Sequence, residues 1–525
     1  MSSLIRLNSA GFLPRSPKRA TVAKACTQFS VRTANDDRVV FSGSAETVYN
    51  DDTAEQLWVV DFSPLTETGT FYIEVPEAGR SVDFRIAVDL YTEPFRTVML
   101  GMYLWRCGCS VSAVHNGVEY SHGECHTDDG CTDFFNGEDA KKEGTGGWHD
   151  AGDYNKYVVN SGVTVGLMLK AWEHFGTAIS GVDLQSVPKG DIPQYLLEIK
   201  WNLDWVFKMQ FPDGRVSHKM SARKFCGGIM PEEEKEKRYF VPWSTSATAS
   251  FVAMMAQAAR IYEPFDTAYS QNCIRAAQLS YDLLGGEQKN VYADQSGFQT
   301  GSYKTEDCDI RLWAAAEMWE TTGEKEYLDD FQRRASGSSV KEQLTWYDVT
   351  NLGMLTYLLS ARDGKDNCLV SNVRKSLVEI ADKLVENSRS HGYGRTLGDF
   401  YNWGSTGTVA GTVHTLYAAF RITGDEKYMH AGEEALGYLL GRNSYGRSFV
   451  TGVGYNPPQN PHCRRSISDR KAWPGYLVGG PCENAGDWKD DSSDFRTNEI
   501  AINWNGAMVY ALSAFLWEMV GKAES

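Results

Sequence analysis

The periodicity of the apolar residues changes near residue 90, and this change constrains the fold more than any other feature of the sequence. Before it, apolar and polar residues alternate, as in FYIEV (71–75) and VDFRIAV (82–88), which is typical of short strands with one buried face. After it, apolar residues recur at spacings of three and four, as in YLLEIKWNLDWVFKM (195–209), which is typical of amphipathic helices. The sequence therefore predicts a small β domain followed by a large helical one.

Residues 1–90 have room for about seven short strands, which is the strand number of an Ig-like β-sandwich. Residues 91–525 form the second predicted domain, with about eleven or twelve helices and no strand pattern between them, which favours an all-α toroid or large bundle over a parallel α/β sheet. The clearest helical stretches are 161–176, 245–262, 268–285, 309–321, 349–361, 371–388, 408–422, 427–441 and 499–520.

The net charge of -16 and the pI near 5.2 argue against nucleic acid and against an anionic membrane as partners, because both bind basic surfaces. No apolar run is long enough to span a bilayer. The first 20 residues lack the apolar stretch of a signal peptide. We expect a secreted monomer whose leader has been removed, with a cytoplasmic protein as the alternative.

The segment GGWHDAGDYNKY (146–157) concentrates one imidazole and two carboxylates, those of His149, Asp150 and Asp153. Asp and Gly also gather in ordinary turns for backbone reasons, so a polar turn is one interpretation. Two carboxylates three residues apart in a glycine-containing loop can instead face one cavity, where one acts as a general base and the other helps to orient its water. A matching acid would then come from elsewhere in the chain.

Cysteine and histidine gather between residues 107 and 149. Two thiolates and two imidazoles suit tetrahedral zinc, and one such set is Cys107, Cys125, His126 and His149. The competing donors are Cys109, Cys131, His115 and His122, and the alternative is a group of buried thiols and surface histidines. A closed site with four protein ligands has no open position, so it would be structural and would pin the loop that carries Asp150 and Asp153.

Near the C-terminus, Glu499 is predicted at the mouth of an apolar helix, after the cap residues Thr497 and Asn498. An acid there can simply compensate the helix dipole, or it can be functional. Loops rich in Pro, Gly, Trp and Arg precede it and contain His462 and Arg464, which are suited to contact a sugar or another hydroxylated substrate. Candidate sugar platforms, or core residues, are Trp403, Trp473 and Trp488. The charged run PEEEKEKRYF (231–240) is predicted to be a solvated loop.

Several segments together carry a resemblance to a known family. From about residue 5 to the C-terminus, GGWHDAGDYNKY, GGIMPEEEKEKRYFVPWSTSATASFVA, HGYGRTLG, NPPQNPHCRRS and TNEIAINWN resemble, in the same order, the family 9 glycoside hydrolases. The sequence is most similar to cellulosomal-type endoglucanases with an N-terminal Ig-like domain. The resemblance implies a mainly α fold, an Ig-like sandwich followed by an (α/α)6 barrel, and inverting hydrolysis of β-1,4-glucans.

The same resemblance implies roles for individual residues. Asp153 matches the general base, Asp150 the residue that helps to hold the attacking water, and Glu499 the general acid. The implied substrate contacts are His462, Arg464 and Asp490, and Trp403 is a further candidate. The implied ligands of a structural zinc are Cys107, Cys125, His126 and His149.

A calcium site is implied at Asp307 and Asp309, where Ile310 stands in place of an acid of the most familiar pattern. Phe495 stands where relatives often carry Tyr, which removes a hydroxyl near the acid. Neither departure removes the base or the acid, so hydrolytic activity is still expected.

The sequence therefore predicts an endo-acting β-1,4-glucanase that binds a β-1,4-glucan polysaccharide or oligosaccharide. The alternative on the same fold is an exo-acting cellodextrinase or exo-β-glucosaminidase. Two further alternatives are a carbohydrate-binding protein without hydrolytic activity and a hydrolase with a catalytic zinc. Retention of Asp150, Asp153 and Glu499 argues against the first of these two.

Overall fold

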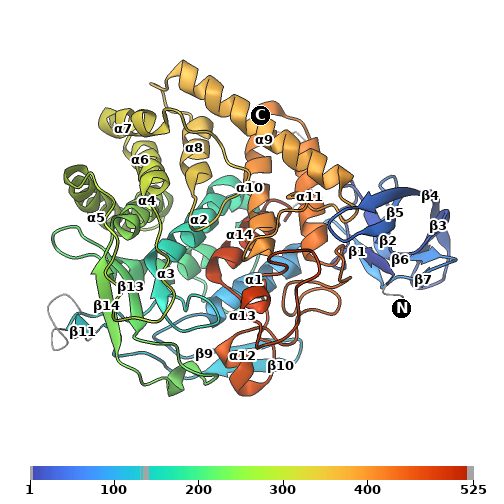
Figure 1. Cartoon of the computed structure of the whole chain (residues 1–525), viewed down its shortest axis with the longest axis horizontal. Coiled ribbons are helices and arrows are strands. Elements are labelled where there is room, and N and C mark those ends of the chain that lie inside the picture. The colour runs from blue at the N-terminus through green and yellow to red at the C-terminus, as the bar shows by residue number, and fades with distance from the viewer. Residues whose placement is uncertain (1–3, 131, 134–140, 517–525) are drawn as a thin grey trace.

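The computed structural model describes residues 4–130, 132–133 and 141–516 (Figure 1). The chain begins with a compact β domain at one side of a larger helical domain. Within the described residues the strands of the first domain are β1 (Ile5–Leu7), β2 (Arg19–Val22), β3 (Gln28–Thr33), β4 (Val39–Asn50), β5 (Glu55–Asp61), β6 (Gly69–Val75), β7 (Gly79–Arg80) and β8 (Phe84–Ile86).

One long strand, β4, joins the two layers of this domain. Its first half, Val39–Ser44, pairs with β3, and its second half, Ala45–Asn50, pairs with β5, both antiparallel. The sheet order β1-β2-β5-β4-β3-β6-β7, with β8 also on β6, thus folds around one apolar core. The predicted antiparallel β domain is confirmed. Of the predicted inward-facing residues, Val88 is 56% exposed, because β8 already ends at Ile86.

Helices dominate the second domain, as predicted. Within the described residues they are α1 (Thr92–Leu104), α2 (Val158–Ser180), α3 (Gln194–Lys208), α4 (Thr245–Tyr262), α5 (Thr267–Gly286), α6 (Cys308–Thr322), α7 (Lys325–Ala335), α8 (Thr350–Leu359), α9 (Asn367–Ser390), α10 (Ser405–Thr423), α11 (Lys427–Leu439), α12 (Arg464–Asp469), α13 (Phe495–Asn498) and α14 (Ile502–Ser513). The periodicity did not single out α1 or α7.

Six of these helices pack in a closed ring. Among the described elements, α2 contacts α4, α4 contacts α6, α6 contacts α8, α8 contacts α10, α10 contacts α14, and α14 returns to α2. Outside the ring, α3 lies on α2, α5 on α4, α7 on α6, α9 on α8 and α10, α11 on α10, and α1 on α14. The ring brings the first and last parts of the domain into contact.

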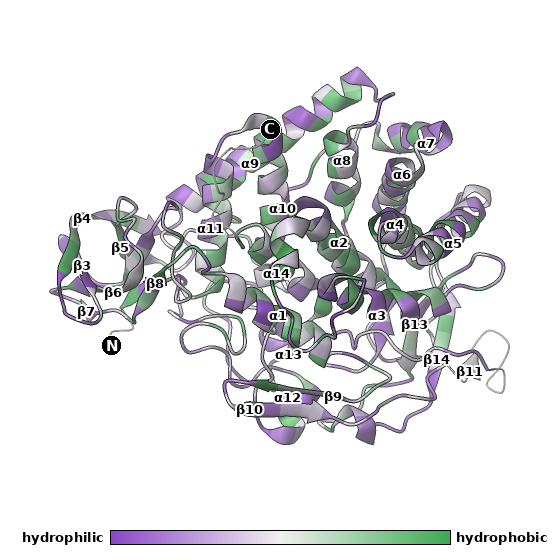
Figure 2. Ribbon diagram, turned by 180° about the vertical axis from the view of Figure 1, so that it is seen from behind, coloured by the Kyte–Doolittle hydropathy of each residue, from purple (hydrophilic) through white to green (hydrophobic). Residues whose placement is uncertain are grey.

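Composition explains which helices form the ring. The sequence of α4, TSATASFVAMMAQAARIY, is rich in small and apolar residues, and nearly all of its side chains are buried. It begins after Ser244, whose hydroxyl oxygen accepts a hydrogen bond from the Ala247 N–H at 3.1 Å. The outer helices α5, α7 and α9 instead have one polar face, and Figure 2 shows hydrophilic and hydrophobic residues interspersed along them.

The expectation of no strands in the second domain is wrong. The described residues contain an antiparallel hairpin, β9 (Val111–His115) and β10 (Val118–His122), and a sheet of order β11-β14-β13-β12. That sheet consists of β11 (Thr132–Asp133), β12 (Lys156–Tyr157), β13 (Ser217–Ala222) and β14 (Arg238–Trp243). The pattern failed because every residue of β13 is buried, although its sequence SHKMSA is largely polar. A 3-10 turn, η1 (Pro231–Glu233), precedes β14.

Polar contacts fasten the β domain to the helical one beside the end of α9. Thr21 Oγ1 donates to the Gly392 carbonyl at 2.6 Å, and Tyr393 OH donates to Glu55 at 2.6 Å. Asp52 and His391 lie 3.0 Å apart and are both nearly inaccessible to solvent. The two domains therefore share a buried polar interface.

In the described part of the chain, we find no helix with the length and hydropathy of a membrane span.

Candidate active site

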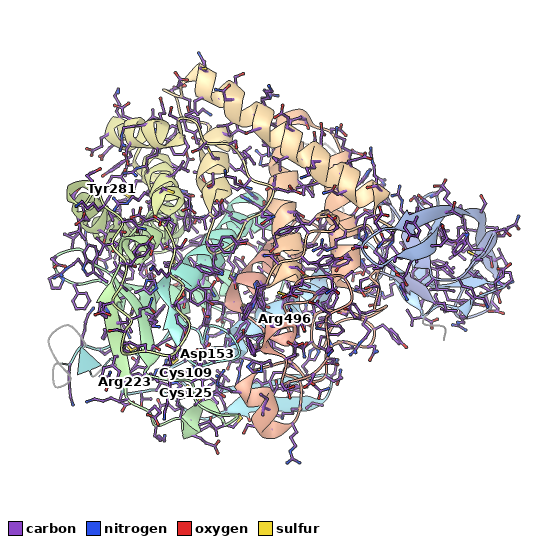
Figure 3. All side chains as sticks on the ribbon, viewed as in Figure 1. Cys109, Cys125, Asp153, Arg223, Tyr281 and Arg496 are labelled. Atoms are coloured by element: carbon purple, nitrogen blue, oxygen red, sulfur yellow. The ribbon has the colours of Figure 1, made fainter. Side chains whose placement is uncertain are left out.

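A cavity of about 690 Å³ opens at one end of the helical ring. Most of its lining comes from the segments just before five of the ring helices, α2, α6, α8, α10 and α14, so the cavity lies at their N-terminal ends. Representative lining residues, in chain order, are Asp153, Tyr303, Trp346, Trp403 and Glu499. Figure 3 shows Asp153 in the helical domain, well away from the β domain. The ring thus gathers side chains from distant parts of the sequence around one space.

Asp153 is held on one oxygen and open on the other. Its Oδ2 accepts hydrogen bonds from Asn155 Nδ2 at 2.6 Å and from Tyr157 OH at 3.0 Å. Asn155 is itself fixed, since its Oδ1 accepts the Ala222 N–H at 3.0 Å. In the described residues no protein group donates to Oδ1 of Asp153, and the carboxyl group lines the cavity. That oxygen is therefore free to accept a proton from a bound water.

Asp150 is buried and has a partner on each oxygen. Asn160 Nδ2 donates to Oδ1 at 2.8 Å, and Tyr303 OH donates to Oδ2 at 2.6 Å. Burial raises the pKa of Asp150 well above its ordinary value, and the neighbouring charge of Asp153 raises it further. Of the two carboxyl groups, Asp153 is the one with an oxygen free for chemistry.

Glu499 reaches the same cavity from the C-terminal end of the domain. Burial, followed by the charges of Asp153 and Asp150, raises the pKa of Glu499 to about 8. Gly152 lies directly against it: a Cβ on Gly152 would come within 3.2 Å of Glu499 Oε1 and 2.4 Å of the His462 carbonyl oxygen. Only glycine therefore allows this approach between the Asp150–Asp153 loop and Glu499.

The predicted placement of Glu499 in the first turn of a helix is wrong. Glu499 follows α13, has extended backbone angles (φ -69, ψ 160) and forms a parallel bridge with His462. The helix α14 begins only at Ile502, after the cap residue Ala501. The apolar run 499–520 hid this break, because Ile500 and Ala501 are apolar but extended.

His462, Arg464 and Trp403 line the cavity, as expected of substrate contacts. The Nδ1 of His462 lies 2.6 Å from the Ser492 carbonyl and must donate to it, so Nε2 is the nitrogen that can accept a hydrogen bond. Trp403 is 50% exposed, whereas Trp473 and Trp488 are buried in the core. Of the three candidate platforms, only Trp403 is available to a sugar.

Asp490 does not line the cavity. Its carboxylate accepts the backbone N–H of Asn460 at 2.8 Å and that of Gln459 at 3.0 Å, and Arg447 Nη2 lies 2.7 Å away. These contacts hold the loop just before His462. In this structure Asp490 acts on the loop conformation and not on the cavity.

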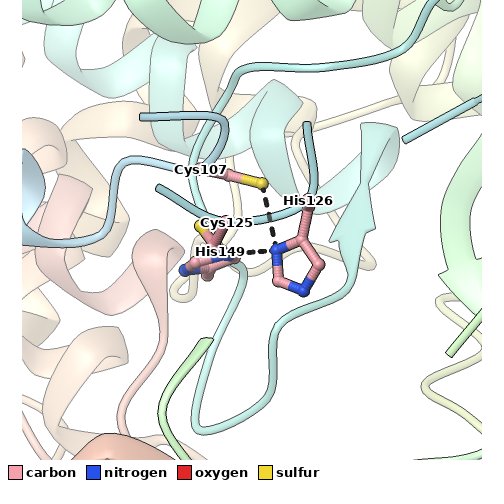
Figure 4. A group of neighbouring side chains, drawn as sticks. All are labelled: Cys107, Cys125, His126 and His149. Carbon is pink, nitrogen blue, oxygen red and sulfur yellow. Dashed lines mark hydrogen bonds between the residues drawn. The ribbon is translucent and has the colours of Figure 1, made fainter. Parts of the chain in front are cut away.

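The predicted metal ligands converge. The Cys107, Cys125, His126 and His149 ligand atoms all lie within 4.8 Å of one another, and the four side chains are buried (Figure 4). His126 Nδ1 lies 3.3 Å from His149 Nε2 and 3.5 Å from Cys107 Sγ. Tetrahedral zinc, with bonds of roughly 2.0 Å to nitrogen and 2.3 Å to sulfur, requires edges of about 3.3 and 3.5 Å. The four residues therefore fit a zinc ion.

Of the competing metal donors, those within the described residues are not part of this group of four. His115 Nε2 contacts the Gly452 carbonyl at 3.2 Å, and His122 Nδ1 contacts the Gly123 carbonyl at 2.8 Å. Cys109 is outside the cluster, and Cys131 falls outside the described residues.

Asp307 does not fit a calcium ligand, because a guanidinium group already occupies its carboxylate. Arg311 Nε donates to Asp307 Oδ2 at 2.8 Å, and Arg311 Nη1 donates to the Leu284 carbonyl at 2.9 Å. Within the described residues Asp309 has no such cation partner, and it accepts a hydrogen bond from the Val349 N–H at 2.7 Å. Burial raises the pKa of Asp309 to about 6, and the nearby charge of Asp348 also raises it. Of the two predicted calcium ligands, Asp309, which lies near Asp348, is therefore better suited than Asp307 to bind a cation.

Sequence reasoning missed the residues that orient the two aspartates: Asn155, Tyr157, Asn160 and Tyr303. Asn155 and Tyr157 belong to the same short segment as Asp153, so their proximity could have indicated the role. Tyr303 comes from a loop far along the chain, and no spacing in the sequence relates it to Asp150.

Comparison with known proteins gives the same family as the sequence resemblance. The family model described as "Cellulase N-terminal ig-like domain" matches residues 1–80, and the one described as "Glycosyl hydrolase family 9" matches residues 91–512. The chain is 52% identical over 522 residues to Endoglucanase D of Acetivibrio thermocellus, covering 98% of this chain and 83% of that protein. It is 33% identical to a cellodextrinase of Butyrivibrio fibrisolvens, over 98% of this chain and 99% of the relative.

A solved structure, a Zn-binding triple mutant of the family 9 endoglucanase J30, superimposes with a TM-score of 0.90 at 30% identity and covers 96% of this chain and 99% of its own. The family match spans the helical domain that holds the three carboxyl groups and the metal cluster. The chain therefore belongs to glycosyl hydrolase family 9 and carries the Ig-like N-terminal domain of cellulases.

Proposed function

We propose that this glycoside hydrolase is an inverting endo-β-1,4-glucanase in which Asp153 is the general base, Asp150 helps to hold the attacking water, and Glu499 is the general acid. One observation carries the proposal: an aspartate with a free oxygen and a glutamic acid with a raised pKa line the same cavity. Inversion requires such a pair across the glycosidic bond, separated by roughly 6.5–9.5 Å so that a water fits.

The two carboxyl groups differ in the way that the chemistry requires. A pKa of about 8 keeps Glu499 protonated at neutral pH, so it can donate a proton to the leaving oxygen. Two neutral donors, Asn155 and Tyr157, bind one oxygen of Asp153 and hold it in place. The other oxygen can then remove a proton from water as the water attacks the anomeric carbon.

Asp150 and the aromatic lining have supporting roles. The buried carboxyl group of Asp150 is held by Asn160 and Tyr303, beside Asp153, and can fix the water that Asp153 activates. Trp346 and Trp403 line the cavity as aromatic contacts for glucose units, and His462 and Arg464 line it as polar contacts. We place Asp490 behind these contacts, as support for the His462 loop.

Endo action is favoured by the 52% identity to an endoglucanase. The alternative is exo action, as a cellodextrinase or exo-β-glucosaminidase. The 33% identity to a cellodextrinase supports the cellodextrinase as the alternative to test. Simultaneous measurement of viscosity and reducing ends on a soluble cellulose derivative separates them. Endo action predicts a steep viscosity loss at few cleavages, whereas a proportional loss would establish exo action. Proton NMR of the first product must show the α-anomer if hydrolysis is inverting.

The remaining features follow from the same assignment. The closed ring of six helices with six outer helices supports an (α/α)6 barrel, and the change of structure between Ile86 and Thr92 supports a domain boundary near residue 90. We propose a structural zinc at the cysteine–histidine cluster, and calcium, if bound, at Asp309 in place of Asp307. We also propose that the protein is secreted and acts on β-1,4-glucan as a monomer.

A further inference from the structure

The run PEEEKEKRYF (231–240), predicted to be a solvated loop, is only partly solvated. Glu233, Lys235, Glu236 and Lys237 are exposed, but Glu234 is 6% exposed and Arg238 is 5% exposed. Burial of a charged side chain is unfavourable unless it is paired and hydrogen-bonded. The partners of these two residues therefore indicate why the chain places them inside.

Glu234 contacts a residue of the metal cluster. Its Oε2 lies 2.9 Å from His126 Nε2, while the opposite ring nitrogen of His126, Nδ1, faces Cys107 and His149. A carboxylate can only accept here, so Nε2 carries the proton and the lone pair of Nδ1 is left for a metal ion. A carboxylate behind a metal-bound histidine fixes the tautomer and the ring orientation.

Arg238 links Glu234 to the loop that carries Asp153, which is here called the catalytic loop. Its Nη1 donates to Glu234 Oε2 at 3.3 Å, and its Nη2 donates to the backbone carbonyl of Tyr154 at 2.7 Å. Tyr154 is the residue immediately after Asp153. The third side of the guanidinium group, Nε, lies 2.7 Å from Asp129.

Lys156 closes the same buried network. Its Nζ lies 2.9 Å from Asp129 Oδ2 and donates to the backbone carbonyl of Gly146 at 2.8 Å. The network thus contains two acids, Glu234 and Asp129, and two bases, Arg238 and Lys156, so its formal charge is balanced. It contacts the catalytic loop on both sides of Asn155, the residue that donates to Asp153.

We propose that Glu234 is a positioning residue that serves two partners at once: it sets the donor geometry of His126 for the metal ion, and it anchors Arg238 against the loop of Asp153. Metal binding and the position of the base are therefore coupled through this one carboxylate. The inference rests on the proposed zinc site, but it concerns residues outside the four ligands.

The test compares zinc binding by the full chain and by two isosteric variants. Glu234→Gln removes the charge at the buried position, and Glu236→Gln makes the same change at an exposed position two residues away. Competition with a chromophoric chelator should show zinc affinity falling roughly 10- to 100-fold for Glu234→Gln and remaining unchanged for Glu236→Gln. With zinc saturating, Glu234→Gln should also have a lower kcat at similar KM.

The outcomes separate the inference from the zinc site itself. If the unmodified chain binds no zinc, both the site and the inference are overturned. If it binds zinc and Glu234→Gln binds equally well, the site stands and the inference is overturned. If Glu234→Gln does not fold, nitrogen-15 NMR of the unmodified zinc-loaded chain decides: the inference requires a proton on His126 Nε2, and a proton on Nδ1 contradicts it.

Discussion

The backbone N–H of Ile502 donates a hydrogen bond to the backbone carbonyl of Asp150 at 2.8 Å. Ile502 is the first residue of α14, and Asp150 lies in the loop before α2, so this bond joins the two ends of the helical ring. Gly152 and Glu499 are in close contact beside it. A backbone hydrogen bond thus links the loop of the proposed base, Asp153, to the segment of the proposed acid, Glu499. Small shifts of either backbone segment therefore change the distance between the two carboxyl groups.

Replacement of Glu499 by Gln should lower kcat on cellulose derivatives by roughly 10²- to 10⁴-fold, because general acid catalysis contributes about that factor. The loss should be much smaller on an aryl cellobioside whose leaving group needs no proton. Initial rates on both substrates provide the measurement, with Glu379→Gln on the exposed surface of α9 as the matched control. Equal losses on both substrates would contradict the acid role.

The stability of the chain should also respond to Glu499 through pH. Because its folded pKa is raised to about 8, above the ordinary value of 4.5, the folded state retains a proton that the unfolded state releases, so this group lowers stability as pH rises from about 4.5 to 8. Glu499→Gln should therefore melt at a higher temperature than the parent at pH 7.5 and at nearly the same temperature at pH 4.5. Calorimetry at the two pH values checks the sign, and a destabilised variant at pH 7.5 would contradict the raised pKa.

The pH profile of activity should report the same group. The alkaline limb of kcat/KM should fall with an apparent pKa near 8, since loss of the Glu499 proton removes the acid. As the three carboxyl groups interact, that value belongs to the cluster. Rates measured between pH 4 and 10 on cellotetraose test it, and an alkaline limb unchanged in Glu499→Gln would assign the titration to another residue.

Removal of the Tyr157 hydroxyl should affect the base directly. Tyr157→Phe deletes one of the two side-chain donors to Asp153, and hydrogen bonds to charged groups contribute about 1.5–3 kcal/mol. The rate, measured as kcat/KM, should fall roughly tenfold or more. Tyr303→Phe is the companion variant, because it removes the donor to Asp150 instead. A rate that falls in Tyr303→Phe but not in Tyr157→Phe would exchange the roles of Asp150 and Asp153.

Loss of zinc should destabilise the chain before it alters the chemistry. We expect one zinc per chain by elemental analysis, and a lower melting temperature after chelation, because a ligand that binds only the folded state stabilises it. Cys107→Ser should reproduce the effect, whereas Cys109→Ser, outside the cluster, should not. If chelation abolishes turnover without changing the melting temperature, the metal is catalytic and the structural assignment fails.

Local patterns in the sequence predicted the two-part fold and many of the cavity residues. The alternation around Ile73 and the three-four spacing around Leu203 reflect burial of one face, which a single sequence records directly. The break at Ile500 and Ala501 was not recorded, because a buried extended segment and a buried helix have the same apolar composition. Strand β13 was hidden for the opposite reason: its polar side chains are buried among partners from other segments.

The site was predictable where function was concentrated in a short segment, and not where it depended on tertiary contacts. The roles of Asp150, Asp153 and Glu499 remain proposals, but the structure brings all three to one cavity, as the resemblance implied. The orientation of Asp150 by Tyr303 and the burial of Glu234 depend on which loops the ring brings together. Charge alone therefore placed Glu234 incorrectly on the surface. The resemblance placed Asp490 among the substrate contacts, whereas its carboxylate here holds the loop before His462.

The closure of the ring by α14 sets a time order for the assembly of the active site. Within the helical domain, the loop of the proposed base leaves the ribosome early, whereas Glu499 and the helix that docks on α2 follow the other five ring helices. Until that docking, a nascent chain has all four proposed zinc ligands but lacks the proposed acid, so the proposed mechanism cannot operate in it. If Glu499 is the acid, as proposed, the helical domain gains its complete catalytic set only when the segment up to α14 has joined the ring.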